Sequence, residues 1–359
     1  MKKILLAGSA MAAFGFAGAA QASEPITLSL GGYMEQWAGF ADSDDGDEAK
    51  NAFQSDSEVY FDGETILDNG IQVGAHIELE AETSSDQIDE QFLYLSGGFG
   101  RFEIGKNDSV ADSMSITAPS VGPVGVNDGD MTAWTDSVSL IDTVPSSGDQ
   151  NRVTYFTPSF GGFQAGVSYA DQGTTNGDFD TEVATVDGDE VIGGFQSDSS
   201  GGDMNIVSAA VAYSGDFDGF SLSVSAEGEN YGEGNWYGIG ANIGFGAFTV
   251  GSSWGHVEDD YGISENATSD RGGDVDAYDI GVSYAMDAAS ISLTYAYQDS
   301  ERTDGDRTPT ETQAIDLGLR YALGAGVSWR SSIFWGEDDV QGGTDTDAYG
   351  AVTGLRLDF

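Results

Sequence analysis

The chain has 359 residues, with 12 Lys and Arg against 61 Asp and Glu, no Cys, and a formal net charge of −49. A field this negative repels nucleic acids and anionic lipid surfaces, which excludes DNA and RNA as partners and favours small cations. Acidity that serves only solubility in a salty medium is the alternative explanation. Without cysteine, an exported chain needs a source of stability other than disulfides, such as a large closed sheet.

The first 22 residues have the features of a secretory signal peptide. Two lysines near the start precede an uncharged, mostly apolar stretch, and Ala-Gln-Ala at 20–22 has the small-x-small pattern of a cleavage site. A retained membrane anchor is the alternative, but the apolar stretch is shorter than the roughly 20 residues that a spanning helix needs. We therefore expect a signal peptide over 1–22 and one β domain over 23–359.

Beyond residue 23, apolar and polar residues alternate with a period of two. From 314 to 322, for example, Ile, Leu, Leu and Tyr fall on one face, and Asp, Gly and Arg fall on the other. This pattern indicates a strand with one apolar and one polar face, and a helix cannot produce it. Sixteen such strands are expected, at 26–40, 53–66, 71–83, 90–97, 101–107, 151–158, 163–170, 204–214, 220–229, 236–245, 247–256, 274–286, 290–299, 311–322, 326–336 and 346–359.

The connections between these strands alternate in length. Short glycine-rich connections such as 68–70, 98–100 and 215–219 are typical of hairpin turns. The long connections, nearly all acidic, are 41–52, 108–150, 171–203, 257–273, 300–310 and 337–345. Short turns on one rim and long loops on the other are the layout of transmembrane barrels, where a closed sheet leaves no unpaired edge in lipid. The sequence therefore predicts an all-β fold: a 16-stranded antiparallel transmembrane barrel with short periplasmic turns, long extracellular loops and a water-filled lumen.

Several segments, in their order and spacing, resemble the general trimeric, non-specific porins of Gram-negative bacteria. They are Ile26 to Tyr33, Val59 to Glu64, Asp68 to Gly70, Gly97 to Asn107, Asn151 to Tyr155, Phe160 to Phe163 and the terminal Phe359. The resemblance implies a homotrimer in the outer membrane, in contact with lipopolysaccharide and lipid, that passes ions and small hydrophilic solutes. It also implies that the third loop, 108–150, folds into the pore, and that Phe359 is the signal recognised by the outer-membrane assembly machinery.

The resemblance further implies a charged constriction. In the family, acidic residues of the third loop face basic residues on the opposite wall, and the loop here contains aspartates but neither Lys nor Arg. The acidic candidates on the loop are Asp108, Asp112, Asp128 and Asp130. The candidates on the wall are Lys106, Arg320, Arg330, Arg356, Glu58 and Glu78.

These wall candidates differ in how alternation places them. The three arginines lie on the polar faces of three neighbouring strands, whereas Lys106 reaches the lumen only if the strand has a bulge at Gly105. Glu58 stands where several relatives carry a basic residue, and Glu78 and Glu80 add negative charge to the next strand. Negative charge thus exceeds positive charge among the candidate residues of the pore, which predicts a channel that prefers cations. A solute-selective porin, or a non-conducting barrel serving as adhesin, structural anchor or outer-membrane lipase, are the alternatives.

Catalytic and metal-binding motifs are weak. The two histidines, His76 on a polar face and His256 on an apolar face, are isolated, and there is no Cys to complete a typical zinc site. His256 alone supports the lipase alternative, and no G-x-S-x-G motif accompanies it. We therefore expect no enzymatic activity and no cofactor. The acidic stretches 42–48 and 178–190 lack EF-hand spacing, so we expect solvated loops, with weak Ca²⁺ or Mg²⁺ binding at the acidic loops as the alternative.

Overall fold

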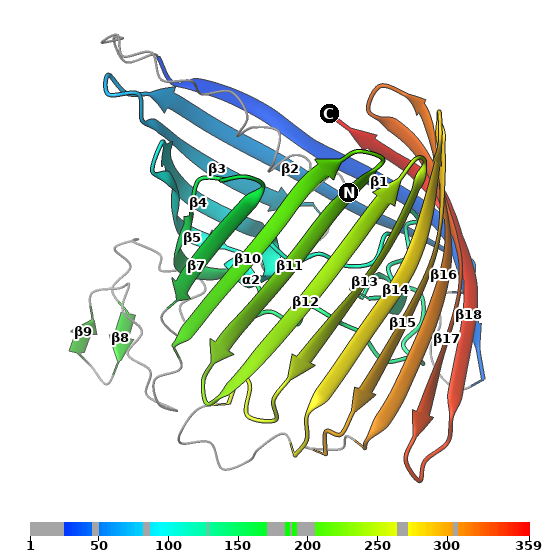
Figure 1. Ribbon diagram of the computed structural model, residues 1–359. Coiled ribbons are helices and arrows are strands. Elements are labelled where there is room, and N and C mark those ends of the chain that lie inside the picture. The colour runs from blue at the N-terminus through cyan, green and yellow to red at the C-terminus, as the bar shows by residue number, and fades with distance from the viewer. Residues whose placement is uncertain are drawn as a thin grey trace.

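The computed structural model describes most of the chain and is almost entirely β-strand (Figure 1). The described residues are 25–44, 50–81, 87–127, 129–170, 184–186, 189–191, 205–263, 272–303 and 308–359. The expected signal peptide at 1–22 and the candidate Asp128 lie outside them. Within the described ranges, no helix is both long enough and apolar enough to cross a membrane.

Sixteen antiparallel strands form a closed barrel (Figure 1). They are β1 (Thr27–Ser43), β2 (Ala52–Ile66), β3 (Gln72–Glu80), β4 (Ile88–Gly97), β5 (Gly100–Asn107), β6 (Gln150–Phe156), β7 (Phe163–Ala170), β10 (Ile206–Phe217), β11 (Phe220–Tyr231), β12 (Gly234–Phe245), β13 (Phe248–Val257), β14 (Val275–Met286), β15 (Ala289–Ser300), β16 (Thr310–Gly324), β17 (Val327–Val340) and β18 (Thr346–Asp358). Each overlaps one predicted segment, so the fold class is confirmed. The predicted loop 171–203 additionally contains a hairpin of β8 (Ala184–Val186) and β9 (Asp189–Val191).

The two ends of the sheet meet in register. Tyr33 of β1 pairs with Asp358 of β18, and the pairing continues without a shift to Ser43 and Ala348. Beyond the last pair, Gly32 and Phe359 exchange two backbone hydrogen bonds of 3.1 and 3.0 Å. The ring therefore has no free edge at this seam, as a sheet surrounded by lipid requires.

Burial alternates along the strands as the sequence predicts. In β16, Ala314 and Asp316 are fully buried, whereas the alternate residues Ile315 and Leu317 are exposed. Exposed Leu, Ile, Val, Phe and Tyr side chains recur on the outer face of most strands. An apolar surface this extensive is stable only against lipid. Aromatic rings on neighbouring strands meet near the short-turn rim, as in the pairs Phe102–Tyr155, Phe217–Phe220 and Phe248–Tyr284.

The long connection between β5 and β6 lies inside the barrel (Figure 1). It includes helix α2 (Val110–Ser113), whose N-terminus is capped by the Ser109 side chain, and a 3₁₀ helix η1 (Asp130–Ala133). Its backbone N–H groups donate to inward-facing side chains of the wall, in the pairs Val110–Ser168, Ile116–Ser225, Ala118–Asp279, Val121–Ser292 and Val124–Ser332. The acceptors lie on β7, β11, β14, β15 and β17, so the loop follows the inner wall around much of the barrel.

The largest apolar cluster of the described residues lies between this loop and the wall. The loop contributes Val124, Val126, Met131, Trp134, Val138 and Ile141. The wall contributes Trp37, Ala41, Ala277, Ala296, Ala314, Phe334, Ala348 and Val352. The barrel thus has its hydrophobic core on the inside of one part of the wall, where burial of the loop offsets the cost of ordering it.

Glycines on the inner face allow the loop backbone to approach the wall. A Cβ added at Gly240 would overlap the carbonyl oxygen of Ile116, and one at Gly318 would overlap the nitrogen of Gly122. These overlaps cannot be relieved by rotating a side chain, because both neighbours are backbone atoms. A larger residue at either glycine must therefore displace the loop.

Gly240→Val is expected to lower the stability of the barrel and to alter its conductance. Overpacking of this kind costs about 1–3 kcal/mol, and the loop can relieve it only by moving into the lumen. Thermal unfolding in detergent and single-channel recording measure the two effects. Gly324→Val is the matched control, since a Cβ there meets nothing within 4 Å. Identical melting and conductance in the two variants would contradict the contact.

Candidate pore lining and constriction

The inner faces of β2, β3 and β4 form an acidic wall. Glu58 on β2 and Glu78 on β3 were predicted for this position, and Glu90 on β4 joins them. Carboxylate oxygens of Glu58, Glu78 and Asp89 all lie within 4.8 Å of one another. We refer below to Glu58, Glu78, Asp89 and Glu90 as the acidic wall. Each pair of ionised carboxylates this close repels strongly, so the wall concentrates negative potential in the lumen.

The acidic wall continues into the two ends of the loop. Glu90, Asp108 and Asp149 form a second set with carboxylate oxygens within 4.8 Å, and the backbone N–H of Asp108 donates to Glu90 at 3.4 Å. Burial, followed by the charges of Asp108, Glu90 and Asp89, raises the pKa of Asp149 to about 9. The structure thus brings the predicted Asp108 to two acidic residues that the sequence did not single out.

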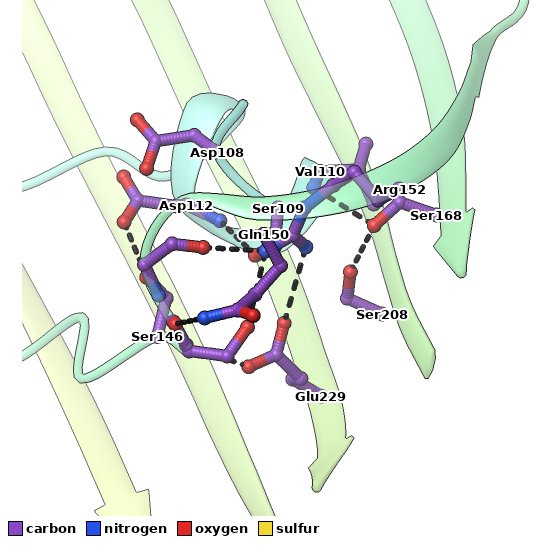
Figure 2. A network of polar contacts seen from close by, with 12 residues as sticks. Asp108, Ser109, Val110, Asp112, Ser146, Gln150, Arg152, Ser168, Ser208 and Glu229 are labelled. Carbon is purple, nitrogen blue, oxygen red and sulfur yellow. Dashed lines mark hydrogen bonds and ion pairs between the residues drawn. The ribbon is translucent and has the colours of Figure 1, made fainter. Parts of the chain in front are cut away.

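The other predicted loop aspartates have different surroundings. Asp112 accepts a hydrogen bond of 2.6 Å from the Ser146 hydroxyl, which ties the beginning of the loop to its end (Figure 2). Asp130 is at the start of η1 and is exposed. Their role at a constriction remains a prediction. The acidic stretches that were weighed for Ca²⁺ or Mg²⁺ binding fall largely outside the described residues.

Arg320, Arg330 and Arg356 lie on the inner faces of β16, β17 and β18, where alternation places them. Arg320 and Arg330 are directly opposite each other in the ladder. The Arg356 guanidinium stacks on the Tyr33 ring, 3.9 Å from its centroid. These residues form a basic patch near the short-turn rim, while their role in a constriction remains a prediction.

Glu35 of β1 partly neutralises this basic patch. Its carboxylate contacts the guanidinium of Arg356 and lies 3.6 Å from that of Arg330. Glu35 is only 7% exposed, so both contacts are shielded from solvent. The sequence did not identify Glu35, although alternation places it on the inner face with Tyr33.

Glu35→Gln is expected to move the reversal potential in a salt gradient toward the anion side. The amide cannot balance the two guanidinium groups, so about one uncompensated positive charge is added to the lumen. Glu311→Gln, at an exposed position, removes the same charge outside the inner face and serves as the control. A shift of equal size in both variants would show that only net charge matters.

The prediction for Lys106 is wrong in its backbone detail. The ladder pairs Lys106 with Gln91 and Asn151 without a register shift, so the expected bulge at Gly105 is absent. Gly105 instead has φ of +145°, a conformation that favours glycine. Lys106 is 4% exposed, and its ammonium donates to the carbonyl oxygen of Ile88 at 2.8 Å. It is therefore a buried cation rather than an exposed group of the lumen.

Arg152 of β6 is a buried cation that the sequence reading passed over (Figure 2). Its side chain is fully buried and lies 3.9 Å from the Glu229 carboxylate of β11. It also donates to Ser147 and Gly148 of the loop. Arg152 therefore fixes the end of the loop to the wall. Its inward position follows from alternation within the 151–158 segment, so this residue could have been found.

The two histidines lie in different environments. His76 is on the inner face of β3, whereas His256 is on the outer face of β13 with Trp254, as predicted. His256 Nδ1 lies 3.2 Å from Asp276, and in the part of the chain that the structure describes no serine hydroxyl hydrogen-bonds to its ring.

Comparison with known proteins agrees with this architecture. A family model described as Gram-negative porin matches residues 7–340. The chain is also 30% identical over 197 residues to an outer membrane porin protein of Bordetella pertussis, and this match covers 47% of this chain and 48% of that protein. The match thus spans about half the length of this curated relative.

Two solved structures share the fold at low sequence identity. The anion-selective porin from Comamonas acidovorans is 16% identical with a TM-score of 0.62, over 93% of this chain and 100% of that one. The trimer form of OmpT from Vibrio cholerae is 13% identical with a TM-score of 0.61, over 94% of this chain and 100% of that one. Because the family model covers most of the chain and the barrel closes with sixteen strands, this chain belongs to the Gram-negative porin family and is an outer-membrane protein.

Proposed function

We propose that the protein is a passive channel that conducts ions and small hydrophilic solutes across the outer membrane, prefers cations and catalyses no reaction. The observation that carries this proposal is the acidic wall together with Asp108, whose carboxylates form connected sets within 4.8 Å. Family membership supports the channel function, and these carboxylates support the preference of the channel for cations.

The balance of charge in the lumen supports cation preference. The loop contacts the inner wall from β7 through β17 and β18 to β1 and the start of β2, and the inner faces of β2, β3 and β4 carry Glu58, Glu78 and Glu90. Among the three arginines of the basic patch, Arg330 and Arg356 both contact Glu35, which reduces the positive charge that they add to the lumen. A narrow passage with low-dielectric walls strengthens both the attraction of these carboxylates for cations and their repulsion of anions.

The assembly state and partners are part of the same proposal. A homotrimer is supported by the trimer form of one structural neighbour. Contacts with lipopolysaccharide and membrane lipid fit the apolar outer surface. Recognition of Phe359 by the assembly machinery fits its place at the end of the closing strand, where its backbone bonds to Gly32.

Planar-bilayer recording with a potassium chloride gradient tests this function. We expect stable open-channel steps and a reversal potential on the cation side, opposite in sign to that of an anion-selective porin. A reversal potential on the anion side would overturn the predicted selectivity. A folded, membrane-inserted protein without conductance would overturn the channel itself and favour a structural or adhesive barrel.

A further inference from the structure

His76 lies between two carboxylates on the inner face of β3. Its Nδ1 is 2.6 Å from Asp62 Oδ1, and its Nε2 is 2.8 Å from Glu78 Oε1. The imidazole also lies between the rings of Tyr60 and Phe92, at 5.9 and 5.2 Å between centroids. Contacts on both edges and both faces fix the orientation of the ring.

This arrangement has the geometry of a metal-binding histidine. His76, Glu78 and Glu90 each offer a ligand atom, and these atoms all lie within 4.8 Å of one another. Two ligands that bind one ion at about 2.1 Å and at right angles lie about 3 Å apart, which is close to the separation of Nε2 and Glu78. Only a small movement would admit an ion between them.

Asp62 provides an independent indication. A histidine that binds a metal through one nitrogen usually donates its other N–H to a carboxylate, which fixes the tautomer and makes the free nitrogen more basic. Asp62 accepts from Nδ1 in this way and leaves Nε2 directed toward Glu78 and Glu90. A cluster held together only by acidic side chains would not have this second carboxylate behind an imidazole.

The site is both charged and accessible. Asp62, Glu78 and Glu90 together carry more negative charge than a protonated His76 balances, and Glu90 also faces Asp108 and Asp149. The side chains of His76 and Glu78 are 17% and 19% exposed, so water and ions reach them from the lumen. A bound divalent cation would relieve the repulsion and could exchange with solution.

We propose that His76, Glu78 and Glu90 form a binding site for a divalent first-row transition-metal ion, such as Ni²⁺ or Zn²⁺, on the wall of the pore. Binding displaces to solvent any proton held at Nε2. The imidazole favours these ions over Mg²⁺ and Ca²⁺, which prefer oxygen ligands alone. Since only three protein ligands are present among the described residues, water fills the remaining positions and the ion stays exchangeable. Its effect on current rests on the proposed channel function.

Titration calorimetry of the full-length folded protein with Ni²⁺ and with Mg²⁺ tests the site without requiring conduction. We expect one Ni²⁺ site per chain, lost in His76→Gln and weakened about tenfold in Asp62→Asn, which leaves all three ligands in place. His256→Gln removes the chain's other histidine, and Glu64→Gln removes one charge elsewhere on β2. Both controls should bind Ni²⁺ like the unmodified protein.

Channel recording then tests whether the ion acts in the pore. Micromolar Zn²⁺ should reduce the current through the unmodified protein and His256→Gln, but not through His76→Gln. Ni²⁺ affinity unchanged in His76→Gln, or Mg²⁺ bound as tightly as Ni²⁺, would overturn the proposal. Conductance without metal is recorded first, so a barrel that does not conduct refutes the channel while calorimetry still decides the site. Far-ultraviolet spectra confirm that each variant is folded.

Discussion

The triple substitution of Glu58, Glu78 and Glu90 by glutamine is expected to move the reversal potential strongly toward the anion side. It removes three carboxylates from one wall while keeping side-chain size and hydrogen-bonding capacity. Two unit charges 4 Å apart in a protein-like dielectric interact by about 4 kcal/mol, so a permeating cation loses a large part of its attraction. The basic patch of Arg320, Arg330 and Arg356, which Glu35 partly neutralises, remains and contributes a larger share of the field in the lumen.

The measurement is the zero-current potential in a tenfold salt gradient, read beside the single-channel conductance. The matched control neutralises three exposed acids on the short-turn rim, Asp68, Asp218 and Asp287, by substitution with asparagine. Net charge changes equally in both proteins, but only the first loses charge from the acidic wall. Equal shifts would mean that selectivity is set by the whole molecule's field, and no shift in either would exclude the acidic wall as its origin.

Asp279→Ala combined with Asp338→Ala is expected to release the loop from the wall. Asp279, 2% exposed, accepts from the Ala118 N–H at 3.1 Å and from the Asn127 amide at 2.5 Å. Asp338 accepts from both the N–H and the hydroxyl of Ser139, the latter at 2.6 Å. Each donor left unpaired in a buried site costs about 1–3 kcal/mol, so the closed position of the loop loses much of its advantage.

We expect the double variant to melt at a lower temperature in detergent and to show a noisier current that closes at lower voltage. Both effects arise because the loop then exchanges between the wall and the open lumen. Asp216→Ala with Asp218→Ala, at exposed positions near the turn after β10, is the control for lost charge. A double variant with unchanged melting and a quiet current would show that the apolar cluster alone holds the loop.

The sequence predicted the barrel because its dominant constraint repeats along the chain. Lipid outside and water inside impose a period of two on every strand, so each strand repeats the same signal. This alternation correctly predicted that the side chains of three arginines face inward, at positions 320, 330 and 356. The outer position of His256 followed in the same way. The hairpin of β8 and β9 escaped notice because its strands are three residues each, too short for a period to be seen.

The arrangement of the site was less accessible because it depends on contacts between distant residues. Alternation indicated that His76 and Glu78 face inward, but the distances of Glu78 and Asp62 from His76 depend on the register of neighbouring strands. The contact of Glu90 with Asp108 depends on how the loop leaves β5. At Lys106, strict alternation led us to expect a bulge at Gly105. The structure instead has a positive φ at Gly105, which changes the local backbone without changing the strand pairing. Alternation indicates the face of a residue, and only the fold determines its neighbours.

The seam between β1 and β18 has a consequence for how this protein is made. Its two partners are the first and last strands of the barrel in chain order, so an intermediate that lacks β18 leaves one edge of β1 without hydrogen-bond partners. Such an intermediate has two unpaired sheet edges, and each edge can pair with a strand of another chain. The order of pairing therefore matters, because the sheet stays prone to joining another chain until β18 closes it onto β1.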